Sequence, residues 1–214
     1  METTLQKARK DPESMKARIL DAARRIFGQY GFHGTTTRMI AKEVGIDIST
    51  LHYHWGEKKD LYAAVVVDIN EDLRRKLADV ERLIHGRPLG ERLALAIDVM
   101  TDYLFEHPEI SNLVLMRYLN KTRSDILIDI RVPEFTCEIA RSMGLAADKR
   151  DVSAEAKMKV LAVMNSIHSF ISGENFFRSI VKADRGTYVS LVKETLKFTH
   201  LPAFARNGIT QDRR

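Results

Sequence analysis

Residues Thr35–Trp55 read TTTRMIAKEVGIDISTLHYHW, and they carry the most specific structural signal in the chain. Ala41 and Gly45 lie four residues apart in it, which is the spacing that a helix-turn-helix needs. The small side chain of Ala41 lets a second helix cross closely over the first, and Gly45 adopts the left-handed conformation that ends a helix before a tight turn. Thr36 and Asp47 are good N-caps for the two helices. The stretch therefore predicts a helix-turn-helix of the kind that binds DNA.

The rest of the chain also indicates helices. Apolar residues recur at intervals of three and four, glycine and proline are few, and strand-like alternation with turn dipeptides is absent. We therefore expect an all-α protein. The expected helices cover residues 12–31, with Asp11 as N-cap, and then 37–44, 48–55, 58–83, 89–106, 109–121, 124–142 with an interruption near Pro133, 152–182 and 187–200. The tail from Pro202 is polar and is expected to fray.

Composition narrows the class of protein. The formal net charge of +5 and the pI near 9.3 permit a polyanionic partner. There is no run of eighteen apolar residues and no apolar stretch near the N-terminus, so neither a membrane span nor a signal peptide is expected. A single cysteine, Cys137, excludes an internal disulfide framework and fits a reducing compartment. We expect a cytoplasmic protein that does not bind membranes.

Enzymatic chemistry is not indicated. The sequence contains no G-x-S-x-G, P-loop, H-E-x-x-H or glycine-rich dinucleotide motif. Its seven histidines are scattered, and His52 and His54 lie on different faces of their helix. We therefore expect no catalytic residues, no cofactor and no metal site.

Several motifs in fixed order between Ala17 and Ala64 resemble the tetracycline-repressor (TetR) family of bacterial transcription regulators. They are an IL-AA-IF stripe, a YGF-GTT connector, an IA-EVG helix-turn and a TL-YHW recognition helix followed by KKDL. The resemblance covers about a quarter of the chain, and the remainder matches the family only in length and helicity. It implies a homodimer with two DNA-binding heads and a helical regulatory core. In such proteins a ligand in the core shifts the spacing of the heads and usually releases the operator.

This resemblance implies a division into two domains. Residues 1–57 are expected to form a three-helix DNA-binding domain that extends into the start of the next helix. Residues 58–214 are expected to form a ligand-binding and dimerisation domain. The expected partners are a double-stranded, palindromic DNA operator, a small lipophilic or amphipathic effector and a second copy of the chain. The alternative is a DNA-binding protein whose helical half recruits a protein partner and senses no small molecule.

The N-terminal part of the second helix of a helix-turn-helix enters the major groove. Leu51 and Trp55 are four residues apart and point inward, which leaves the other face of that helix for DNA. The expected DNA contacts are Thr35, Thr36, Thr37, Arg38, Ile48, Ser49, Thr50, His52, Tyr53, His54 and Lys58. A structural role is the alternative for His54, and a solvated helix start is the alternative for Lys58. Lys7, Arg9 and Lys10 form either a DNA-contacting arm or a disordered tail.

Two departures from the family pattern affect how DNA is read. His52 stands where the family often has tyrosine, and Ile48 where it often has lysine, so residues 45–57 contain no Lys or Arg. A bidentate arginine contact with guanine is the commonest specific base contact, and the second helix does not offer one. Our hypothesis is that specificity depends on thymine-methyl packing, hydroxyl contacts and DNA shape.

The second half of the chain offers candidates for an effector site and a dimer interface. In each set the alternative is that the residues only fill the core of the protomer. Arg117 is expected to need an anionic partner if it is partly buried. The expected ligand-binding residues are Met100, Tyr103, Leu104, Met116, Arg117, Phe135, Met164, Asn165 and His168. The expected interface residues are Phe170, Phe176, Phe177, Ile180, Tyr188, Leu191, Val192 and Leu196.

Overall fold

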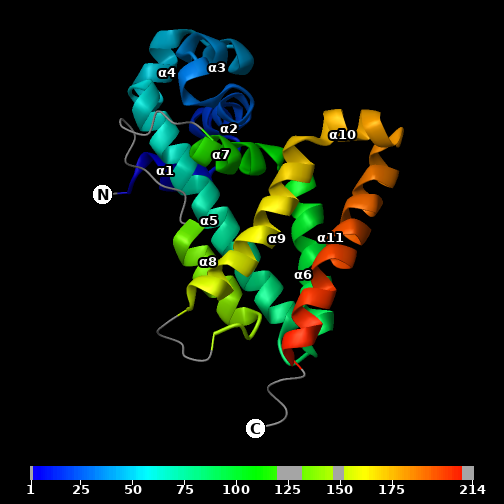
Figure 1. Cartoon of the computed structure of the whole chain (residues 1–214). Helices are drawn as coiled ribbons and strands as arrows, with labels where there is room; N and C mark the ends of the chain where they lie inside the picture. The colour runs from blue at the N-terminus through cyan, green and yellow to red at the C-terminus, as the bar shows by residue number, and fades with distance from the viewer. Residues whose placement is uncertain (1, 120–131, 147–151, 209–214) are drawn as a thin grey trace. The chain divides into compact units, whose positions relative to one another are not determined.

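The chain is all-α, as the sequence predicts. The computed structural model (Figure 1) describes residues 2–119, 132–146 and 152–208, with the side chains of 117–119, 132 and 203–208 left out. The helices are α1 (Thr4–Lys10), α2 (Met15–Gly34), α3 (Thr37–Val44), α4 (Ile48–Trp55), α5 (Lys58–Ile84), α6 (Leu89–Glu106), α7 (Pro108–Leu119), α8 (Val132–Ser142), α9 (Ala154–Ser172), α10 (Glu174–Val181) and α11 (Arg185–Gly208).

The helices form two compact units, which we describe separately. The head unit comprises Met1–Asp72 and Glu109–Ile130, and the core unit comprises Leu73–Pro108 and Arg131–Arg214. Helix α5 contributes its first half to the head unit and its second half to the core unit. A domain boundary at residue 57 stays a prediction, since these units divide the chain at other positions.

Helix α2 supplies the apolar stripe of the head unit. Ile19, Ala23 and Phe27 are completely buried along one face of α2, because they recur at helical spacing. The ring of Phe27 meets that of Tyr62 on α5 edge to face at 5.0 Å between centroids. At Gly31 the backbone leaves helical geometry with φ of 67°, which redirects the chain toward α3.

Residues ahead of α2 form a folded helix, which the sequence analysis did not predict. The Thr3 hydroxyl oxygen accepts a hydrogen bond from Gln6 N at 3.2 Å, and the Gln6 side chain accepts one from Thr3 N at 2.8 Å, so α1 begins with a capping box. Ala8 of α1 is 2% exposed. The expectation of a helix capped by Asp11 is wrong, because Ser14 caps α2 instead.

The core unit is built around α6, α9 and α11, which contact one another in pairs (Figure 1). Lys197 and Lys193 of α11 form ion pairs with Asp98 and Asp102 of α6. The apolar side chains buried here come from all three helices and include Leu93, Ile97, Leu104, Val160, Ile167, Val192 and Leu196.

The single helix expected over 152–182 is interrupted at Gly173. This glycine caps the end of α9 and precedes α10. A Cβ atom at Gly173 would lie 2.4 Å from Cε2 of Phe177, whose ring therefore packs where a side chain would otherwise stand. Pro133 occupies the first turn of α8, where a missing N–H costs little, and the residues before Val132 lie outside the described part of the chain. Pro202 lies inside α11, so the expected fraying at that residue is wrong.

We expect His168 to make the stability of the protein depend on pH. It is buried in α9, and burial lowers its pKa to about 4 from an ordinary 6.5. The unfolded chain takes up a proton near pH 6.5 and the folded chain does not, so stability that is present above that pH is lost as pH falls toward 4. We expect urea unfolding free energies to drop by about 2 kcal/mol more in wild type than in His168→Gln between pH 7.5 and 5. Equal slopes would contradict this.

Candidate nucleic-acid interface

The turn between α3 and α4 has the predicted geometry. Gly45 lies in the left-handed region with φ of 78° and ψ of 36°. Its N–H and that of Ile46 both donate to Ala41 O at 3.0 Å, which satisfies the end of α3. Arg18 of α2 donates to Val44 O at 3.2 Å. Thr36 and Asp47 cap α3 and α4, as expected.

Substitution of Gly45 tests this turn. No atom lies within 4 Å of a Cβ atom built there, so the cost of a side chain is a backbone cost alone. We expect Gly45→Val to lower the free energy of unfolding by about 2 kcal/mol, since a β-branched residue tolerates positive φ poorly. Gly45→Asn is the matched control and should lose less, because asparagine visits this region. Urea unfolding of both variants measures the difference, and a Val variant as stable as wild type would refute the strain.

Helix α4 turns one face into the head and the other toward solvent. Leu51 is fully buried and Trp55 is 6% exposed, with the indole N–H of Trp55 donating to Lys16 O at 3.1 Å. On the other face, Tyr53 is 84% exposed, the largest exposed fraction among the exposed apolar and aromatic side chains of the described residues. Ser49 and His52 are exposed as well. The outward face of α4 is thus available to a partner.

The polar groups at both ends of this face form hydrogen bonds within the protein. Asp47 Oδ1 lies 2.6 Å from Ser49 Oγ and accepts from Thr50 N at 2.7 Å. The bond from the Ser49 hydroxyl, followed by those from Thr50, holds the pKa of the Asp47 carboxyl below its usual range. At the other end, His52 Nδ1 lies 2.8 Å from Gly56 O.

Several expected DNA contacts have other roles in the structure. Thr35 is fully buried and its hydroxyl donates to Gly31 O at 2.7 Å, so its side chain is not at the surface where DNA could contact it. The Lys58 ammonium donates to Phe32 O at 3.0 Å and to Thr35 O at 2.9 Å, which leaves one N–H for an outside partner.

The remaining candidates differ in exposure. Thr36 and Arg38 are exposed, while Ile48, Thr37 and Thr50 are half-buried. His54 is half-buried, with its Nδ1 3.5 Å from Lys16 Nζ. Burial, together with the charge of Lys16, lowers the pKa of His54 and so favours its neutral ring.

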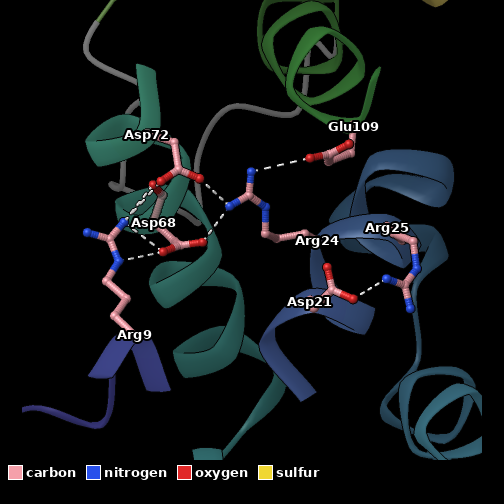
Figure 2. Close-up of polar contacts among 7 residues, drawn as sticks. All are labelled: Arg9, Asp21, Arg24, Arg25, Asp68, Asp72 and Glu109. Atoms are coloured by element: carbon pink, nitrogen blue, oxygen red, sulfur yellow. Dashed lines mark hydrogen bonds and ion pairs between the residues drawn. The ribbon is translucent and has the colours of Figure 1, made fainter. Parts of the chain in front are cut away.

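A cluster of five charged residues, which the sequence analysis missed, joins four helices of the head unit. Figure 2 shows two guanidinium groups on opposite sides of the carboxylates of Asp68 and Asp72 on α5. Arg9 of α1 donates to Asp68 Oδ1 at 2.7 Å, and Arg24 of α2 pairs with Asp68 Oδ2 at 2.6 Å and also with Asp72. Arg24 also reaches Glu109 of α7 at 3.2 Å. Arg9 is therefore neither part of a disordered tail nor free to contact DNA.

The charges of this cluster favour the ionised arginine strongly. Burial alone would lower the pKa of Arg24, but the hydrogen bond to Asp72 and the charges of Asp68, Asp72 and Glu109 outweigh it and raise the pKa. The sequence shows only a pair of acids, Asp68 and Asp72, four residues apart within α5. The partners of that pair are far away in sequence and follow no local pattern.

Helix α7 packs on α2 at very short range. A Cβ atom at Gly28 would lie 2.5 Å from Cβ and 2.8 Å from Cα of Glu109. One turn further along, a Cβ atom at Gly31 would lie 3.3 Å from Sδ of Met116. Residues 109–116 of α7 therefore belong to the same compact unit as the helix-turn-helix, although they are distant from it in sequence.

The described part of the chain does not indicate a metal site or a membrane-spanning helix. Its histidine, cysteine, aspartate and glutamate side chains form no group of three or more that is placed to hold a metal ion. No helix among the described residues has both the length and the apolar character to cross a membrane.

A capped helix-turn-helix with an exposed second helix is typical of DNA-binding regulators. Comparison with known proteins shows which family the chain resembles. Residues 19–65 match the model of bacterial regulatory proteins of the tetR family. The chain is 24% identical over 145 residues to the transcriptional regulator UidR of Escherichia coli K12, covering 68% of this chain and 72% of UidR. It is 31% identical over 107 residues to the repressor SCO4008 of Streptomyces coelicolor, covering 50% of this chain and 51% of that repressor.

Solved structures agree in fold. A TetR-like transcriptional regulator from Rhodococcus sp. RHA1 superposes with a TM-score of 0.55 at 18% identity, covering 86% of this chain and 94% of that one. The family model and the relatives together support a helix-turn-helix transcriptional regulator of the TetR family, and the solved structure shares its fold. Regulators of this family bind operator DNA and act as dimers.

Proposed function

We propose that the protein is a repressor that binds its operator as a dimer through α4 of each head and releases it when a lipophilic or amphipathic effector binds the core unit. The observation that carries the DNA-binding part is that α4 is buried on one face and exposed on the other. Leu51 and Trp55 fix this helix in the head, while Tyr53, 84% exposed, stands on the opposite face. Such a helix presents its side chains to a groove without unfolding anything.

The effector part of the proposal depends on the core unit. Leu104, Phe135 and His168 are buried there, and Met100, Tyr103 and Met164 are half-buried. Asn165 is exposed on α9 and Met116 belongs to the head unit, so we leave both out of the proposed site. The side chain of Arg117 lies outside the described residues. The remaining set is mostly apolar, which supports an effector of similar character.

The dimer surface that we propose lies on α10 and α11. Phe176, Ile180, Leu191 and Phe198 are between 41% and 81% exposed. A cluster of such side chains on a soluble protein is typical of an interaction surface. Phe170 and Phe177 are half-buried, with ring centroids 5.9 Å apart. Three further residues of the expected interface are at most 3% exposed, so we leave them out of the proposed surface: Tyr188, Val192 and Leu196.

Fluorescence anisotropy with the DNA upstream of the protein's own gene tests operator binding. We expect saturable binding that survives an excess of random DNA and weakens with salt. Each neutralised phosphate contributes about −0.9 to the slope of log K against log salt, so roughly three to five contacts per head predict a slope of about −5 to −9 for a dimer. A slope near zero would contradict this mode of binding.

Tyr53→Ala tests the exposed face of α4. Its phenol ring contacts only the His54 ring among the contacts described, at 5.2 Å between centroids. We expect operator affinity to fall about tenfold, because a base or phosphate contact is worth about 1–3 kcal/mol, while the calorimetric melting temperature stays within about 2 °C of wild type. Tyr30→Ala, which removes another exposed tyrosine, on α2, is the matched control and should retain affinity. Equal affinities of the two variants would exclude Tyr53 from the interface.

The alternative is that the core unit recruits a protein partner. Thermal stabilisation by small amphipathic compounds separates the two proposals, since a ligand at about 100 times its Kd adds roughly 2.7 kcal/mol of stability. Stabilisation together with loss of operator binding would support effector sensing. A compound series without effect, alongside intact operator binding, would favour the protein partner.

A further inference from the structure

Two polar side chains on the exposed face of α4, Ser49 and His52, use a hydrogen-bond donor inside the protein. Ser49 Oγ lies 2.6 Å from Asp47 Oδ1. A carboxylate can only accept, so the Ser49 hydroxyl gives its one hydrogen to Asp47 and turns its lone pairs to solvent. The Asp47 carboxylate is itself exposed and adds a further acceptor beside it.

His52, one turn further along α4, also uses a hydrogen-bond donor inside the protein. Its Nδ1 lies 2.8 Å from Gly56 O, and a carbonyl oxygen can only accept, so Nδ1 carries the hydrogen. In the neutral imidazole the other ring nitrogen, Nε2, then has a lone pair and no hydrogen. Ser49 and His52 are three residues apart and both exposed, so the two acceptors share one face of α4.

We propose that Ser49 Oγ and His52 Nε2 determine operator specificity by accepting hydrogen bonds from exocyclic amino groups in the major groove. In that groove only adenine N6 and cytosine N4 are donors, whereas guanine and thymine present oxygen acceptors at the same place. The helix should therefore select adenine or cytosine on the strand that it contacts. This inference rests on the proposed binding of operator DNA through α4.

The residues of α4 and its neighbours increase the preference for adenine or cytosine over guanine or thymine. Guanine or thymine would bring an oxygen lone pair against Ser49 or His52 and leave both groups desolvated without a hydrogen bond. Helix α4 has no Lys or Arg to offset this. Arg38 and Lys42 are exposed on α3, so a guanine contact would come from that helix instead.

Selection from a randomised duplex library with the full-length protein is the first test. The positions read by the two residues are those whose preference disappears in Ser49→Ala or His52→Ala. At these positions we expect wild type to favour adenine or cytosine about fivefold. Preference for guanine or thymine there overturns the inference and leaves operator binding intact. Absence of any enriched sequence would overturn operator binding and the inference together.

A charge-matched pair of variants tests the direction of the hydrogen bond at His52. His52→Arg replaces the acceptor by donors and should shift the preference at its position to guanine. His85→Arg makes the same change at an exposed site after α5, in the core unit, and should keep the wild-type preference. An unchanged preference in His52→Arg would overturn the assignment.

Base analogues test the same contact from the DNA side without altering the protein. In the selected site, adenine is replaced by purine, which lacks the 6-amino group, or by 7-deazaadenine, which lacks the N7 acceptor. At a contacted position we expect purine to weaken binding about fivefold and 7-deazaadenine to have no effect. The cytosine analogue without its 4-amino group serves where cytosine is selected. The opposite result with the two adenine analogues, loss only with 7-deazaadenine, would show that α4 donates to DNA.

Discussion

Arg24→Met is expected to lower the free energy of unfolding of the head unit by about 3 kcal/mol. The Arg24 side chain is 13% exposed and lies between Asp68, Asp72 and Glu109. Methionine keeps most of the packing of the aliphatic stem and removes the charge. Asp68 and Asp72 then keep their ion pairs with Arg9 but lose those with Arg24, so the repulsion between the two carboxylates is offset less. Urea unfolding at pH 7 measures the loss.

Arg25→Met is the matched control, because Arg25 follows Arg24 in sequence and its ion pairs are exposed. Its side chain is 52% exposed and pairs with Asp21 (Figure 2) and with Glu43. Exposed pairs contribute less than about 1 kcal/mol, so this variant should resemble wild type. Similar losses in both variants would mean that the buried cluster adds nothing beyond ordinary surface charge.

Gly28→Val is expected to destabilise the protein by a similar amount, about 3 kcal/mol. The added Cβ would stand 2.5 Å from Cβ and 2.8 Å from Cα of Glu109, and the second of these atoms belongs to backbone that cannot rotate away. Helix α7 would have to move off α2, which would also pull Glu109 from Arg24. Calorimetric melting of the variant should show the loss.

The control for Gly28 is Gly90→Val, the same change at another helical glycine. A Cβ atom at Gly90, in the first turn of α6, has no neighbour within 4 Å. We expect its melting temperature to stay within about 2 °C of wild type. Equal melting temperatures of the two valine variants would show that the close packing of α2 and α7 does not require glycine at position 28.

The sequence predicts the helix-turn-helix well because the signals there are local. The caps Thr36 and Asp47 and the left-handed Gly45 act within one turn of the backbone, and each has the expected role. The same is true of the helix over 89–106, whose bounds agree with α6. Helix α1 was missed although Thr3 and Gln6 fit the capping-box pattern, because a helix of 7 residues is too short to show an apolar period.

Long-range contacts are what the sequence did not predict. Arg24 and Glu109 are 85 residues apart, and no periodicity connects them. The candidate dimer residues show a second limit. A spacing of three and four residues identifies the apolar side of α11, but it does not tell Val192, which fills the core of the protomer, from the exposed Leu191. The charge cluster, and the distinction between core and surface residues on α11, could therefore be identified only from the structure.

Trp55 gives the protein a built-in optical reporter for one of its two units. It is the only tryptophan in the chain, it is 6% exposed, and its indole N–H donates to Lys16 O, so its emission should shift to the red when the head unit opens. Far-ultraviolet circular dichroism reports the helices of both units. Melting curves recorded by both signals therefore reveal whether the DNA-binding part unfolds on its own or together with the core unit. Addition of a compound that binds only the core unit should separate the two curves if the units are independent.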